Sequence, residues 1–179
     1  MTLDGIIQRY RRWILARRGV AIDKACYVHS FVSVGEWPPI HPPKAIQIGA
    51  ECELGRGVEL NPWGGRIRLG RRVFLGPYVI IYGHGGVDIG DHSLVGMHCR
   101  ILSSNHAVPP RDKVIRNEPD IPLRTIIGRD CWLGAGVTVL GGIEIGDGCV
   151  VGAGAVVTKN LPPYSIASGV PAQITGQRQ

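Results

Sequence analysis

The sequence predicts an all-β solenoid of about six triangular coils, and three observations support this prediction. An aliphatic residue recurs at every sixth position, in a register that survives four interruptions. Eleven of these eighteen marker residues are followed directly by glycine, and each interruption falls after the third side of a coil. A six-residue period fits neither a helix nor a plain strand, but it fits coils made of three flat six-residue sides. The markers are Ile22, Val28, Val34, Ile48, Leu54, Leu60, Leu69, Leu75, Ile81, Ile89, Val95, Ile101, Ile127, Leu133, Val139, Ile145, Val151 and Val157.

Residues 1–19 precede the first coil and predict a short amphipathic helix. Apolar side chains recur there at a spacing of three to four, and arginines occupy many of the other positions. Such a helix can cap the open end of the solenoid, which otherwise exposes a sheet edge. A basic amphipathic helix also suits weak association with an anionic membrane surface, so both roles stay open. The apolar positions are Leu3, Ile6, Ile7, Tyr10, Trp13 and Ile14.

We expect the solenoid over residues 20–159, followed by a C-terminal tail, residues 160–179, that packs back on the stack. The longest of the four insertions covers residues 103–124. Because every insertion follows the third side of a coil, all four should leave from one edge of the prism. Insertions confined to one face of a repeat protein often mark its binding site.

Composition narrows the class of protein. The length of 179 residues suits one domain, and 44% hydrophobic residues with only two Phe predict an aliphatic core. No apolar run is long enough to span a bilayer and no signal-peptide pattern is present, which predicts a cytoplasmic protein without a transmembrane segment. The net charge of +6 suits a polyanionic ligand. The basic residues form no stripe with interleaved aromatics, so nucleic acid is not an expected partner.

Five cysteines could indicate disulfides or a metal site, but their pattern favours neither. Each lies four residues after a marker, in a slot that elsewhere holds small or apolar side chains. The count is odd and there is no CxxC pair, which fits buried packing residues in a reducing compartment.

The histidines are the main candidates for chemistry. His84, His92 and His98 lie on three consecutive sides, so they cannot converge on one metal ion within a chain, and we expect no metal. His106 follows Asn105 at the root of the longest insertion, where an imidazole is well placed as a general base. No motif for covalent catalysis is evident. A direct attack on a bound donor needs only this one base and positioning.

Other residues suit the binding of an extended, phosphorylated ligand. Trp132 is expected to face outward, where it could stack on a ligand ring or be buried between subunits. Ala135 and Ala153 lie in Gly- and Ala-rich runs that let a ligand approach the backbone. Thr158 and Lys159 supply a hydroxyl and a positive charge suited to phosphate.

These stretches resemble the hexapeptide-repeat acyltransferases, which form left-handed parallel β-helices, and above all the sugar O-acetyltransferases of the galactoside, maltose and exopolysaccharide types. The matching parts are Ile89–Gly96, His106 and Ile126–Ala172. The resemblance implies a homotrimer that transfers an acetyl group from acetyl-CoA to a hydroxyl of a sugar or glycan precursor, with active sites between subunits.

The resemblance also implies roles for individual residues. His106 matches the catalytic base, and Trp132 matches a tryptophan that lines the acetyl-CoA site. Ala135 and Ala153 match positions whose backbone binds the pantetheine arm, and Thr158 and Lys159 match residues near the nucleotide of coenzyme A.

The acceptor-binding residues cannot be carried over from the resemblance. Gly76-Pro77-Tyr78 replaces an Asn-containing segment, and the N-terminal acidic residue that holds the sugar in the galactoside-type enzymes has no obvious match. We predict that the acceptor site lies on or near the insertion edge, because aromatic faces there suit a sugar ring. The candidates are Trp37, Trp63, Tyr78, His84 and Asn105.

Three alternatives stay open. N-acetylation of an amino sugar uses the same scaffold, and the sequence separates it poorly from O-acetylation. A zinc hydratase similar to the γ-class carbonic anhydrases also uses this fold, but it would leave Trp132, Thr158 and Lys159 unexplained. A non-catalytic scaffold would leave unexplained the position of His106 at the root of the only long loop.

Overall fold

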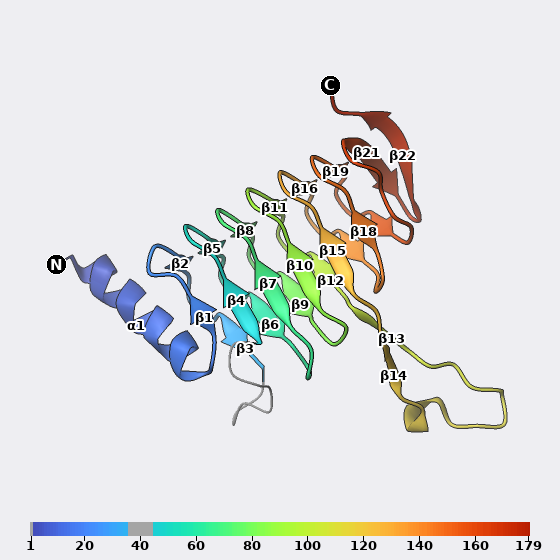
Figure 1. Cartoon of the computed structure of the whole chain (residues 1–179), viewed down its shortest axis with the longest axis horizontal. Helices are drawn as coiled ribbons and strands as arrows, with labels where there is room; N and C mark the ends of the chain where they lie inside the picture. Colours follow the sequence, from blue (N-terminus) through green and yellow to red (C-terminus); the bar gives the residue numbers. More distant parts are fainter. Residues whose placement is uncertain (1, 36–44) are drawn as a thin grey trace.

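The computed structural model describes residues 2–35 and 45–179, and it confirms a left-handed parallel β-helix (Figure 1). Strands of two or three residues follow one another around three flat faces, which we call A, B and C. Face A holds β1 (Ala21–Ile22), β4 (Ile46–Ile48), β7 (Ile67–Leu69), β10 (Val87–Ile89), β15 (Thr125–Ile127) and β18 (Glu144–Ile145). Face B holds β2 (Tyr27–Val28), β5 (Glu53–Leu54), β8 (Phe74–Leu75), β11 (Leu94–Val95), β16 (Trp132–Leu133) and β19 (Val150–Val151). Face C holds β3 (Ser33–Val34), β6 (Glu59–Asn61), β9 (Ile80–Tyr82), β12 (Arg100–Ile101), β17 (Thr138–Val139) and β20 (Val156–Val157).

The marker residues stack in register from coil to coil. Ile89, for example, lies opposite Leu69 on one neighbouring strand and opposite Ile127 on the other. Side chains such as Ile81 and Leu133 are fully buried, so the core is a column of aliphatic side chains that removes apolar surface from water. The backbone groups of each strand bond to the coils on both sides, which makes the column rigid.

The tight corners of the coils account for the positions of the glycines and the cysteines. A Cβ added at Gly90 would lie 2.5 Å from the backbone nitrogen of Arg129 on the next coil, so that corner has no room for a side chain. All five cysteines are buried and unpaired, as the pattern predicted. Their thiols also donate hydrogen bonds to carbonyl groups of the next coil, for example Cys131 Sγ to Gly146 O at 3.1 Å.

The insertions leave the stack where face C passes into face A, and we call this line the C–A edge. The first insertion, with Trp37, lies outside the described residues. The second and third follow β6 and β9, and the fourth follows β12, so within the described part of the chain they share one edge as predicted. The fourth projects from the stack as an arm (Figure 1). It contains β13 (Ser104–His106), the 3₁₀ turn η1 (Ile115–Asn117) and β14 (Asp120–Pro122), with β13 and β14 antiparallel.

Helix α1 (Leu3–Arg17) covers the N-terminal end of the stack (Figure 1). It buries one apolar side chain, Leu15, in the core, and otherwise contacts the stack through polar side chains. Gln8 is buried, its Nε2 donates to Val28 O at 3.2 Å, and its Oε1 accepts from Val28 N at 2.8 Å. Arg11 and Arg12 donate to the carbonyls of Val28 and Cys26. Apolar side chains of the predicted stripe, including Tyr10 and Trp13, lie exposed.

The tail closes the other end. β21 (Ser165–Gly169) pairs in parallel with β19 on face B, and β22 (Ala172–Gln177) folds back antiparallel to β21. In the described part of the chain, no helix is both long and apolar enough to cross a bilayer.

Candidate active site

His106 lies at the end of β13, where the antiparallel pairing with β14 places it opposite Asp120. Its Nδ1 is 3.0 Å from Asp120 Oδ1, and its Nε2 is 2.7 Å from the carbonyl oxygen of Ile115. Both partners accept hydrogen bonds, so the ring is held at both nitrogens. The arm therefore fixes the orientation of the imidazole while leaving the side chain partly exposed to solvent.

These contacts change the acidity of His106. The hydrogen bond to Asp120, followed by the one to the Ile115 carbonyl, raises the pKa of His106 above its usual 6.5. A ring that acts as a base must have a nitrogen free to accept a proton. Nδ1 is tied to Asp120, so Nε2 is the nitrogen that can serve, once the Ile115 carbonyl moves away.

Asp120 also joins His106 to a second group of predicted residues. Its Oδ2 is 3.5 Å from His84 Nε2, and the His84 ring stacks on Trp63 with 5.6 Å between the ring centroids. His84, Trp63 and His106 are thus brought together at the C–A edge, around a carboxylate that sequence reasoning missed. Its pairing with a histidine 14 residues earlier depends on the register of the β13–β14 hairpin, which the sequence of the long loop does not specify.

The root of the arm is anchored to the third insertion. Gly85 N donates to Ser103 O at 3.0 Å, and Leu123 N donates to the same oxygen at 2.7 Å. The buried hydroxyl of Ser103 donates to Tyr82 O at 2.7 Å. The two ends of the arm are therefore tied to one point of the solenoid, only a few residues from His106.

Of the two other described acceptor candidates, one lies beside His106 and one at a different corner of the coil. Asn105 is exposed on the arm, next to His106. Tyr78 lies in the turn between β8 and β9, where face B passes into face C, and it stacks on His98 with 5.3 Å between centroids. The prediction that Tyr78 lies near the insertion edge is therefore wrong, because the residue belongs to a different corner of the coil.

The predicted cofactor residues lie along face B and two edges. Trp132 projects from β16 on face B and is 56% exposed. Ala135 and Ala153 are exposed at the corner between faces B and C. A Cβ added at the neighbouring Gly154 would meet nothing within 4 Å, so a ligand can reach the backbone there. Thr158 and Lys159 are exposed just beyond β20, at the C–A edge.

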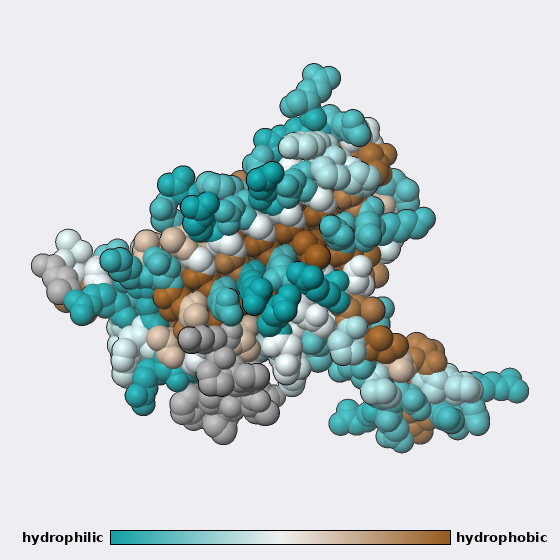
Figure 2. Space-filling model, viewed as in Figure 1, coloured by the Kyte–Doolittle hydropathy of each residue, from teal (hydrophilic) through white to brown (hydrophobic). Residues whose placement is uncertain are grey.

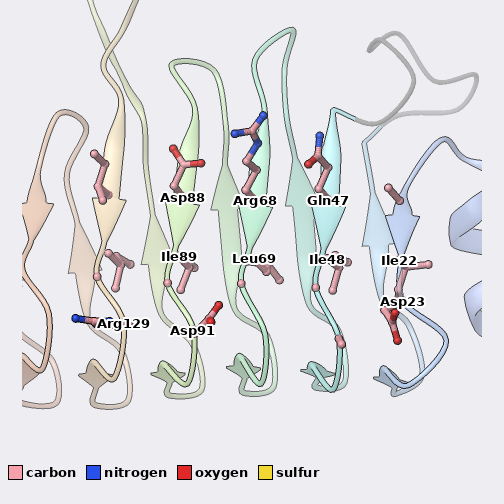
Figure 3. Close-up of a pocket in the computed structure, with 18 of the residues that line it drawn as sticks. Ile22, Asp23, Gln47, Ile48, Arg68, Leu69, Asp88, Ile89, Asp91 and Arg129 are labelled. Carbon is pink, nitrogen blue, oxygen red and sulfur yellow. The ribbon is translucent and has the colours of Figure 1, made fainter.

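A groove of about 1040 Å³ runs along face A (Figure 3). Its floor is aliphatic, with Ile48, Leu69 and Ile89, and charged side chains such as Asp88 and Asp91 lie on its two sides (Figure 3). A hydrophobic band follows the stack on this side of the molecule (Figure 2). None of the predicted site residues lines this groove, so it is separate from the candidate chemistry.

No three His, Cys, Asp or Glu side chains within residues 2–35 and 45–179 gather closely enough to hold a metal ion. His92 and His98 lie at two further corners of the coil, away from His84, as their spacing predicted.

Comparisons with known proteins agree with this geometry. Residues 124–159 match the bacterial transferase hexapeptide family (six repeats), and residues 66–99 match the hexapeptide repeat of succinyl-transferase. The putative lipopolysaccharide biosynthesis O-acetyl transferase WbbJ of Escherichia coli is 35% identical, over 73% of this chain and 70% of its own length. Several other curated relatives are 31–34% identical, and the chain spans only 57–63% of their length.

Solved structures show the same architecture. The hexapeptide-repeat acetyltransferase VCA0836 of Vibrio cholerae, complexed with acetyl-coenzyme A, has a TM-score of 0.65 at 25% identity, covering 100% of this chain and 80% of its own. The N-acyltransferase AntD of Bacillus cereus, in complex with dTDP-4-amino-4,6-dideoxyglucose and coenzyme A, has a TM-score of 0.78 at 19% identity, covering 94% and 89%. The second likeness shows the fold alone. With the repeat, the parallel β-helix and the WbbJ match together, the chain belongs to the hexapeptide-repeat acetyltransferase family.

Proposed function

We propose that the chain is an acetyl-CoA-dependent O-acetyltransferase that acetylates a hydroxyl of a sugar or glycan precursor. The main support is the pair formed by His106 and Asp120 on the arm at the C–A edge. A hydroxyl attacks poorly while it keeps its proton, so this reaction needs a base beside the acceptor. An oriented imidazole held by a carboxylate suits that task.

In this proposal His106 Nε2 takes the proton of the acceptor hydroxyl as its oxygen attacks the acyl carbon of the thioester. The carbon–sulfur bond then breaks, and the leaving thiolate of coenzyme A takes the proton back from the imidazolium. Asp120 holds Nδ1 and stabilises the positive charge that the ring carries between these steps. The Ile115 carbonyl, now 2.7 Å from Nε2, must give way to the acceptor.

We also propose that the active site forms between the subunits of a homotrimer. Face B lies opposite the C–A edge in a triangular prism, so Trp132 and His106 of one chain point in different directions. They can meet only when the arm of one subunit reaches face B of another. An exposed tryptophan of this kind is also typical of an interface. Light scattering after size exclusion tests this, with an expected mass three times that of the 19.3 kDa chain.

The first experiment is a calorimetric titration with acetyl-CoA, with and without excess EDTA. We expect micromolar binding at one site per chain that is indifferent to the chelator. A signal that disappears with EDTA would refute the proposal in favour of a metal-dependent hydratase. Failure of a purified trimer to bind would favour the scaffold.

Substitution then tests the base. His106→Ala should lower turnover roughly a hundred- to ten-thousand-fold and leave acetyl-CoA affinity nearly intact. His92→Asn is the matched control, because His92 is an exposed histidine at another corner, with a left-handed φ of 64° that asparagine tolerates. Near-normal turnover of His106→Ala would contradict the mechanism. Parallel assays with sugars and amino sugars decide between O- and N-acetylation.

A further inference from the structure

A small pocket of about 340 Å³ opens beside the candidate active site, on the C–A edge. It is lined by three glycines of the second and third insertions and by three long side chains that carry nitrogen donors. The lining residues are Gly65, Arg66, His84, Gly85, Gly86 and Arg124.

The pocket carries a surplus of positive charge. Arg66 Nη2 lies 3.3 Å and Arg124 Nη2 2.7 Å from the same oxygen, Asp88 Oδ2. One carboxylate, Asp88, thus faces the two guanidinium groups that line the pocket. The remaining positive potential favours an anion in the pocket.

Two nitrogens of the pocket are buried and lack hydrogen-bond partners: Arg66 Nε and His84 Nδ1. Buried polar atoms are almost always hydrogen-bonded, and Arg66 Nε–H can only donate, so it points to a missing acceptor such as an oxyanion; the role of His84 Nδ1 depends on the tautomer of the ring. Between the arginines lies the backbone of Gly86, and a Cβ added there would come 3.5 Å from Arg66 Cγ and 3.9 Å from Arg124 Cγ. Gly86 therefore places no side chain of its own between the two arginines.

The carboxylate of Asp120 connects the pocket to His106, the candidate base. His84 lines the pocket and contacts Asp120 Oδ2 through Nε2, while Asp120 Oδ1 holds His106 Nδ1.

We propose that this pocket binds an oxyanion of the acceptor, so that the acceptor is a sugar carrying a phosphate or a carboxylate. This inference rests on the proposed function for its link to acetyl transfer. Arg66 and Arg124 bind the anion with charge-assisted hydrogen bonds, and the anion fixes which hydroxyl lies beside His106.

The test measures binding without transfer. The intact protein, saturated with coenzyme A, is titrated with galactose, galactose 1-phosphate and galacturonate. We expect the two anionic sugars to bind roughly tenfold tighter than galactose or better, and Arg124→Gln and Arg66→Gln to remove this preference. Arg71→Gln is the matched control, since Arg71 forms a similar ion pair with Asp91 at another corner of the coil. Equal binding of the three sugars, or a preference that survives both pocket substitutions, overturns the proposal.

A competition experiment distinguishes the acceptor from the donor, because coenzyme A also carries phosphates. Inorganic phosphate is titrated into the protein with and without saturating coenzyme A. Undiminished phosphate binding supports an acceptor site, whereas displacement by coenzyme A assigns the anion to the donor and overturns the proposal. If the intact protein binds the anion at this pocket but transfers no acetyl group, the proposed function is refuted and the proposed anion site is not.

Discussion

Gly85 packs against the two ends of the arm that carries His106, and its contacts predict the effect of adding a single methyl group at this position. A Cβ at Gly85 would lie 2.3 Å from the backbone nitrogen of Leu123 and 2.5 Å from Ser103 O, well inside the 3.4 Å at which ordinary contact begins. Both atoms belong to backbone at the two ends of the arm, so neither can turn aside as a side chain would. We therefore expect Gly85→Ala to displace the arm from its contact with residue 85.

The size of the effect follows from what must break. Overpacking typically costs about 1–3 kcal/mol. The hydrogen bonds from Gly85 N and Leu123 N to Ser103 O contribute about 0.5–1.5 kcal/mol each. The free energy of unfolding should thus fall by about 2–6 kcal/mol. A displacement of His106 by about 1 Å should also lower kcat/KM roughly a hundredfold.

Denaturant unfolding and acetyl-transfer kinetics measure the two effects, and two other glycines provide controls. Gly176→Ala places a Cβ 4.0 Å from its nearest neighbour, at a position whose φ is not left-handed, and should change stability by less than about 0.5 kcal/mol. Gly64→Ala meets nothing within 4 Å but has a φ of +84°, so it isolates a backbone cost of about 1 kcal/mol. If Gly85→Ala matches the wild type in stability and kcat/KM, the arm is not seated as described.

Three further predictions follow from the site, the core and the helical cap. Asp120→Asn should lower kcat and move the acid limb of the kcat/KM pH profile to lower pH. Asp120 raises the pKa of His106, which must be deprotonated to act as the base, so its loss lets His106 stay deprotonated at lower pH. An acid limb that does not move would exclude the pairing of Asp120 with the base. Thiol titration with Ellman's reagent should find no fast-reacting cysteine in the folded protein and five after denaturation, because all five thiols are buried. Burial raises the pKa of Cys131 to about 11; the hydrogen bond with Cys52 lowers the pKa of Cys26 to about 7, but that side chain is only 1% exposed and the reagent cannot reach it. Fast labelling of the native protein would contradict the packing. Gln8→Leu should lower the free energy of unfolding by about 1–3 kcal/mol, because it leaves Val28 N without its partner; unchanged stability would mean that water replaces the amide.

The solenoid was readable from the sequence because its cause is local and repeated. Every buried position recurs after six residues, and each corner needs a small residue where the next coil passes, as at Gly90. The same register located the insertions and therefore the edge that carries His106. It also separated His92 and His98 from His84.

The contacts of the site were less predictable because they depend on geometry between segments. Asp120 reaches His106 only because β13 and β14 form a hairpin, and the prolines of its long loop indicate a turn but not which residues pair. Tyr78 was misplaced because proximity to an insertion in sequence is not proximity to it in space. The helix α1 buries only Leu15 among its apolar side chains and presents Gln8 and arginines to the stack, whereas an apolar stripe is normally what a helix buries.

The way α1 meets the first coil limits how far this architecture can extend. A parallel β-helix has no intrinsic length, because each end displays the same row of N–H and C=O groups that recruited the previous coil. The Gln8 amide bonds both the N–H and the C=O of Val28, as a further strand would, and the β21–β22 hairpin occupies the opposite end. A chain without these two caps would expose complementary unpaired strand edges at its two ends. We expect such chains to associate end to end into fibres rather than to remain discrete particles.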